Sequence, residues 1–147
     1  MLLLLLLYCI AAFLGAAMLG IVASRQRSMT PALYAATLLI SVVAAAVALT
    51  QLLGGGDVPA TILPLGLPWI GARFRLDGLA ALFVAVINLG GAAASLYAIG
   101  YGRHEPSPQR VLPFFPAFLA GMNLVLLADD AFTFLLSWEL MSVASWA

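Results

Sequence analysis

The chain has 147 residues, of which 65% are hydrophobic and 8% are charged, and its formal net charge is zero. Soluble globular domains are roughly 45–50% apolar and about 25% charged, so this composition excludes a soluble domain. It also excludes a disordered chain, which would be poor in apolar residues. Without net charge or a basic patch, a nucleic-acid partner is not expected. The composition indicates an integral membrane protein.

Apolar segments then divide the chain. Each is compared with the roughly 20 residues that a helix needs to cross a bilayer core. The first run lacks a positively charged n-region and exceeds a typical signal-peptide core, so we expect it to remain as a span. We predict an all-α integral membrane domain over residues 1–147, with about five transmembrane helices and the last one truncated. The expected helices are residues 2–23, 31–53, 79–99, 111–128 and 131–147.

The arginines predict the orientation, because loops rich in Arg and Lys stay on the cytoplasmic side. Four of the six arginines lie in the loops after the first and third helices, and the other two lie in the loop at 54–76. This favours a multi-pass protein of the inner (plasma) membrane with an extracytoplasmic N-terminus. The 54–76 loop has three prolines and ends in polar–apolar alternation. It predicts a short extracytoplasmic hairpin, with Trp69 at the membrane interface.

Small residues spaced by four form rows that allow two helices to approach closely. We expect the row in the third helix, more than that in the first, to be a helix contact. The rows are Ala12, Ala16 and Gly20 in the first helix, and Gly90, Ala94, Ala98 and Gly102 in the third.

Glu139 is the strongest functional candidate, because an ionisable side chain inside a membrane span is costly and is usually functional. It lies about eight residues into the fifth segment, roughly 12 Å deep and close to the bilayer centre. The chain has no lysine, and its arginines lie in loops. A carboxyl group at this depth suits a proton relay, and the alternative is a neutral acid that hydrogen-bonds to another helix. Ser142, three residues on, is placed to hydrogen-bond the carboxyl group or a water molecule.

The remaining polar residues predict structural roles. Asn88 and Asn123 fall near the centres of the third and fourth helices, where amides usually bond across helices, and a hydrated path is the alternative. Asp129 and Asp130 precede the fifth helix, so capping is favoured over proton entry. His104 stands without a cysteine or carboxylate cluster, so we expect no metal site and no cofactor.

Two stretches resemble a known family. Phe134–Trp146 (FLLSWELMSVASW) resembles the fifth-helix motif of the antiporter-like, proton-translocating membrane subunits, in which a glutamate follows an aromatic residue and precedes Leu-Met-Ser. Glu139 occupies the glutamate position. Residues 75–83 (RLDGLAALF) resemble the start of the family's third helix, and SLYAIGY follows at 95–101. The family includes complex I pump subunits and Mrp antiporter subunits, and the wording is most similar to hydrogenase-4 component B.

The resemblance implies a mechanism in which the fifth-helix glutamate pairs with a lysine on a later helix. Protons would move through a hydrated mid-membrane path, driven by redox chemistry in a separate arm. Family members have many more helices, so we expect an N-terminal fragment of a hydrogenase-4, formate hydrogenlyase or complex I-like NADH:quinone oxidoreductase subunit. Its partners would be other membrane subunits, the bilayer and protons. The alternatives are a Mrp-type cation/proton antiporter subunit and a truncated fragment without function.

Overall fold

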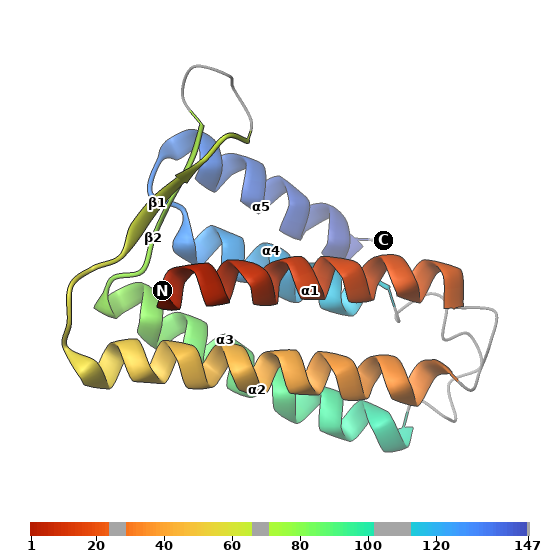
Figure 1. The fold of residues 1–147 in the computed structure, drawn as a ribbon. Helices are drawn as coiled ribbons and strands as arrows, with labels where there is room; N and C mark the ends of the chain where they lie inside the picture. Colours follow the sequence, from red (N-terminus) through yellow and green to blue (C-terminus); the bar gives the residue numbers. More distant parts are fainter. Residues whose placement is uncertain (24–28, 66–70, 102–112, 147) are drawn as a thin grey trace.

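The computed structural model describes residues 1–23, 29–65, 71–101 and 113–146. Helices in this part of the chain run alternately in opposite directions, and a two-stranded hairpin crosses the end of the bundle at which the first helix begins (Figure 1). The expected all-α membrane architecture with a hairpin is confirmed. The elements are α1 (Leu2–Ala23), α2 (Thr30–Gly54), β1 (Ala60–Leu63), β2 (Ala72–Arg75), α3 (Gly78–Tyr101), α4 (Phe114–Leu127) and α5 (Ala131–Trp146).

The helices differ in length. Three of them, α1, α2 and α3, are long and apolar enough to cross a membrane by length and composition. The other two, α4 and α5, have 14 and 16 residues. The fourth helix ends at Leu127, because Ala128 adopts an extended backbone and forms an antiparallel bridge with Phe74 of β2. The backbone that follows α4 therefore pairs with the hairpin instead of continuing the helix.

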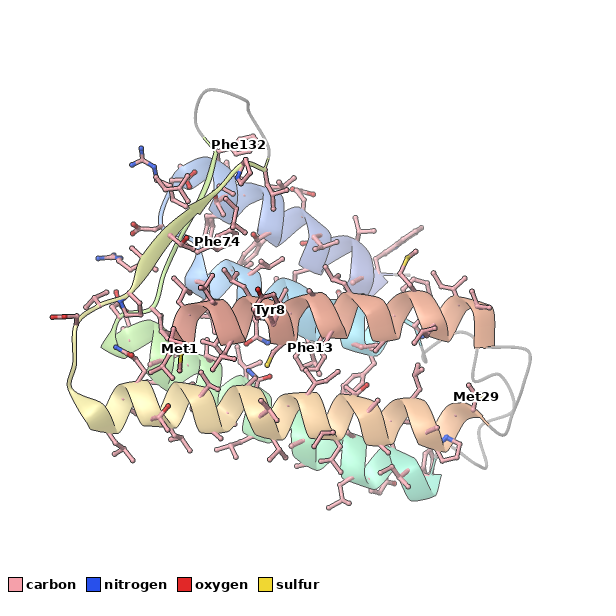
Figure 2. The ribbon with its side chains drawn as sticks, in the orientation of Figure 1. Met1, Tyr8, Phe13, Met29, Phe74 and Phe132 are labelled. Carbon is pink, nitrogen blue, oxygen red and sulfur yellow. The ribbon has the colours of Figure 1, made fainter. Side chains whose placement is uncertain are left out.

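The apolar core lies where α1, α2, α3 and α4 meet and continues under the hairpin. Phe13 of α1 is fully buried, and Figure 2 shows it between α1 and α2. In the hairpin, Phe74 of β2 is 4% exposed, and Leu76, just after β2, is fully buried. These apolar side chains cover the end of the helix bundle. This burial fixes the hairpin against the helices on one face, since alternate residues of β2 point inward.

Of the small-residue row expected in the third helix, Ala98 alone among the described members packs against another helix, at Leu33 and Tyr34. Gly90 and Ala94 are exposed, Ala98 is half-buried, and Gly102 lies outside the described residues. The close contact runs one position along, through Gly91. A Cβ at Gly91 would lie 3.1 Å from the Leu119 side chain and 3.2 Å from the Ser41 hydroxyl. The prediction was wrong for Gly90 and Ala94 because small residues occur on two faces of α3, and spacing alone does not distinguish them.

The hairpin pairs β1 and β2 antiparallel, in register from Ala60 opposite Arg75 to Leu63 opposite Ala72. Gly71, just before β2, has φ of +67°. Its Cα lies so close to β1 that a Cβ would be 2.9 Å from the Leu63 carbonyl oxygen. A glycine is therefore required there. Trp69, which we expect at the membrane interface, lies outside the described residues, as does His104.

Candidate functional site

Helix α5 is held against α4 at one very close point. A Cβ at Gly121 would lie 2.8 Å from the Cα of Met141, so the two backbones touch where Gly121 has no side chain. The buried residues of α5 are Thr133, Ser137 and Ala144, which form the stripe that faces the rest of the chain. Glu139 follows Ser137 by two residues, roughly 200° around the helix. It therefore points away from α4 and is exposed.

An apolar groove runs beside Glu139, between α5 and the hairpin. Its walls are apolar side chains of three elements, and Glu139 stands at its edge. Within the described chain, no hydrogen bond or ion pair engages the Glu139 carboxyl group. The lining residues other than Glu139 are Leu65, Ala72, Phe74, Leu124, Thr133, Leu136, Ser137, Leu140 and Val143.

No hydrogen bond joins Ser142 to Glu139 within the described chain, and the supporting role expected of Ser142 stays a prediction. Ser142 is half-buried, whereas Glu139 is exposed. Side chains three residues apart on an α-helix point roughly 60° away from each other. Here this angle leaves Ser142 partly packed and Glu139 exposed. Ser142 therefore lies near the carboxyl group in sequence without engaging it.

Asn88 and Asn123 form a buried amide pair between α3 and α4. Nδ2 of Asn88 donates to Oδ1 of Asn123 at 2.7 Å. Each amide also donates to the carbonyl one turn earlier in its own helix, at Val84 and Leu119, both at 2.8 Å. The expected bond across helices is thus present. A role of these amides in a hydrated path stays a prediction.

Asp130 caps α5 and at the same time anchors it to the hairpin. Its Oδ1 accepts a hydrogen bond from the backbone N–H of Thr133 at 2.9 Å, and its Oδ2 accepts from the Thr133 hydroxyl. The backbone N–H of Arg73 in β2 also donates to Oδ2, at 3.1 Å. These hydrogen bonds, first of all that from the Thr133 hydroxyl, lower the pKa of the Asp130 carboxyl group. The capping expected of Asp130 is confirmed.

Asp129 has a different role from the capping predicted for it. Its Oδ1 accepts from Nε of Arg75 at 2.8 Å, and its backbone N–H donates to the Arg73 carbonyl at 2.9 Å. The capping prediction was wrong for Asp129 because the residue before the cap faces the hairpin rather than the first turn of α5. Arg75 also lies 3.6 Å from Oδ2 of Asp77, whose Oδ1 accepts from the Ala80 N–H and caps α3.

We name these five residues, Arg73, Arg75, Asp77, Asp129 and Asp130, the hairpin clasp. It joins the second strand to the starts of α3 and α5. The sequence contained one signal for it, since an Asp directly before an apolar run is typical of a helix N-cap and Asp77 is so placed. The ion pair with Asp129 joins residues 54 positions apart, and local spacing carries no information about such a contact.

Comparisons with known proteins show what this chain is similar to. No family model matches the chain. Hydrogenase-4 component B of Escherichia coli (strain K12) is 39% identical over 74 residues, or 49% of this chain and 11% of that protein. NADH-quinone oxidoreductase subunit L of Mycobacterium tuberculosis (strain H37Rv) is 29% identical over 86 residues, or 58% and 14%. The expected resemblance is confirmed.

Antiporter-like relatives also include a protein named antiporter subunit mnhA2 from Staphylococcus aureus (strain MRSA252), which is 34% identical over 100 residues, or 60% of this chain and 12% of that protein. Among solved structures, a chain of the membrane-bound sulfane sulfur reductase, an archaeal respiratory membrane complex, aligns with a TM-score of 0.76. It covers 96% of this chain and 29% of that one at 19% identity, which establishes a shared fold. This chain spans between 11% and 14% of the length of the named relatives.

Proposed function

We propose that this chain is a portion of a proton-translocating membrane subunit and that Glu139 is the group that takes up and releases the proton. One observation carries the proposal. Glu139 is the single Asp, Glu, Lys or Arg side chain inside a helix of the described chain, and all the others in that part lie at helix ends, in the hairpin or in loops. An ionisable group placed so deep is retained for function far more often than for stability.

The direction of the Glu139 side chain supports a partner outside the described residues. Facing lipid, a carboxylate would cost several kcal/mol, on the order of the values for charged groups at the bilayer centre. The described chain offers no cation to the groove, since no arginine lines it and the Arg75 side chain engages Asp129 and Asp77. We therefore propose that another membrane helix covers the groove and carries a cationic side chain, which the family resemblance implies to be a lysine.

The proposed assembly is a hydrogenase-4, formate hydrogenlyase or complex I-like NADH:quinone oxidoreductase. Similarity to hydrogenase-4 component B and to NADH-quinone oxidoreductase subunit L supports it. In this proposal the redox chemistry takes place on other subunits, and this chain supplies a proton-carrying carboxyl group. Membrane subunits that bury the outward face of α5 are the partners.

The test is proton uptake by proteoliposomes that contain the assembled complex. Glu139→Gln keeps the size and hydrogen bonding of the side chain but removes its exchangeable acid. We expect this variant to lose proton uptake by at least tenfold, whereas Glu139→Asp retains part of it. The matched control is Asp57→Asn, which removes an exposed carboxyl group outside the helices and is expected to leave uptake unchanged. Equal uptake by the wild type and Glu139→Gln would remove the relay role.

A cation/proton antiporter subunit is the second candidate, favoured by similarity to the antiporter subunit from Staphylococcus aureus. The two candidates share Glu139 and differ in what drives the proton. Uptake that requires a sodium or potassium gradient, and that persists without an electron donor, identifies the antiporter. Uptake that requires an electron donor identifies the oxidoreductase subunit.

We also propose that the hairpin and the N-terminus lie outside the cytoplasm in the inner (plasma) membrane. The positively charged loops that support this orientation contain four of the six arginines of the sequence. In a Cys9→Ser background, Asp57→Cys is expected to react with a membrane-impermeant thiol reagent added to intact cells. Reaction only after the cells are opened would reverse the proposed orientation.

A further inference from the structure

Two buried serines in the contact between α2 and α3 make no hydrogen bond. Ser41 of α2 and Ser95 of α3 are both fully buried, and the Oγ of each has no partner. Burying a hydroxyl group without a hydrogen-bond partner costs free energy. Bulk water does not reach a helix contact in lipid, so it cannot supply the missing hydrogen bond. Two such groups in one helix contact call for a physical explanation.

Other buried hydroxyls in the helices of this chain show the usual solution. A helical Ser or Thr satisfies its hydroxyl by donating to the carbonyl three or four residues earlier. Thr37 donates to Leu33 at 2.9 Å, and Ser137 donates to Thr133 at 2.7 Å. Ser41 and Ser95 do not use this local acceptor, so their hydroxyl groups are directed into the interface instead.

The two hydroxyls lie within about one helical turn of each other. The Ser41 Oγ lies 3.2 Å from the position that a Cβ on Gly91 would take. Ser95 is one turn after Gly91 on the same buried face of α3, and a helical side chain leans toward the N-terminal turn, here toward Gly91. Because α2 and α3 run in opposite directions (Figure 1), the turn before Ser41, which contains Thr37, faces Ser95.

We infer that this contact is a binding site for a water molecule, bridged by Ser41 and Ser95. The Thr37 oxygen, which already donates to Leu33, keeps free lone pairs and supplies a third polar partner. Three partners match the two to four hydrogen bonds that buried waters typically make. The site is independent of Glu139, which lies on α5 and faces away from these helices, so it stands whether or not the proposed proton relay is correct.

The experiment combines a direct readout with a stability cycle. In nanodiscs, proton-detected solid-state NMR of the wild-type chain is expected to show magnetisation transfer from water to the backbone amides of Gly91 and Ser95. It should not reach the amide of Ala81, a buried residue of the same helix. This measurement needs no variant. Absence of transfer at Gly91 and Ser95 overturns the proposal.

The cycle comprises Ser41→Ala, Ser95→Ala and the double variant of these two. Ser137→Ala is the control, because the Ser137 hydroxyl is buried but has a partner. Each single serine variant is expected to lower the unfolding midpoint by roughly 2–4 °C. The double variant should lose no more than either single one, because one bridging water is removed in each case. Ser137→Ala should add its loss independently to that of Ser41→Ala. Unchanged or raised midpoints would mean a dry contact, and additive losses would mean unconnected hydroxyls; either overturns the proposal.

Discussion

The polar groups at the start of α5 and the one in its middle, Glu139, have opposite surroundings. At the start of α5, both aspartates have partners within the chain, with Asp130 accepting from Thr133 and Arg73, and Asp129 accepting from Arg75. Two turns further on, Glu139 has no partner in the described chain and faces an apolar groove. The paired charges at the start of α5 serve the fold, whereas for the unpaired Glu139 we propose a partner outside the described residues. Four experiments on α5 and its contacts test this difference.

The largest effect is expected where α5 touches α4. Gly121→Val places a branched side chain against the Met141 backbone, where even a Cβ would lie 2.8 Å from Cα. Overpacking of this kind costs about 1–3 kcal/mol or more, because a backbone cannot move aside as a flexible side chain can. Thermal unfolding in detergent measures the loss. Gly90→Ala is the control, since nothing lies within 4 Å of its Cβ position, and it should be neutral or stabilising. A variant at 121 as stable as the wild type would disprove the close contact.

Asp130 is next, and its effect depends on pH. The pKa of its carboxyl group is lowered in the folded chain, and an unfolded Asp has a pKa of about 3.9. The stability that comes from its charge is therefore fully present above about pH 3.9 and is lost as the pH falls through the folded-state pKa. Asp130→Asn keeps a good cap without the charge. Its unfolding midpoint should lie below that of the wild type at neutral pH, with a gap that closes in acid.

A gap that stays constant from neutral pH down to acid would contradict this prediction. It would assign the role of Asp130 to the shape of its side chain rather than to its charge. Asp57→Asn serves as the comparison, because that carboxyl group is exposed in the loop between α2 and the hairpin.

The ion pair between Arg75 and Asp129 should contribute less. The two side chains are 49% and 32% exposed, so water and salt screen the pair. A double-mutant cycle of Arg75→Gln and Asp129→Asn is expected to give a coupling of roughly 0.2–1 kcal/mol that falls as salt is raised. Zero coupling at low salt would show that the backbone hydrogen bonds of the clasp hold the hairpin without the ion pair.

Glu139→Gln should have the smallest effect on the fold of the chain itself. Glu139 makes no contact within the described chain that a glutamine would lose, so the free energy of unfolding is expected to change by less than about 0.5 kcal/mol. Membrane insertion, measured by carbonate extraction, should also be intact, because a neutral amide costs no more there than a protonated acid. Clear loss of insertion would mean that Glu139 is structural and would remove the contrast with the clasp.

Sequence reasoning reached the helical elements because apolar length is a local property. The run before Arg25 and the run after Pro31 are visible without any tertiary knowledge, and so is the hairpin at the polar–apolar alternation around Arg73 and Arg75. Glu139 could be singled out in the same way, because it is the one acid within an apolar segment. Its role remains a proposal, since the groove shows where it points and not what covers it.

Contacts between distant residues could not be predicted in this way. The choice between Gly90 and Gly91 as the contact face of α3 depends on where α2 and α4 lie, and small residues occupy both faces. The roles of Asp129 and Asp130 divide because the hairpin backbone arrives at Arg73 to meet them. Ser142 fails to engage Glu139 for a similar reason, since packing rather than spacing fixes its direction.

The shortness of α4 has an electrical consequence. Its 14 residues rise about 21 Å, whereas the 25 residues of α2 rise about 37 Å and a bilayer core is about 30 Å thick. Pro113 lies against Gly20, so α4 begins about one turn short of the end of α1. Lipid must thin beside α4, or the aqueous phase must reach further inward. The membrane voltage then drops over a shorter distance at α4 than at α2. If the proposed proton relay operates at Glu139, each ångström that a proton moves beside α4 crosses a larger share of the roughly 2.3 kcal/mol that 100 mV supplies per charge.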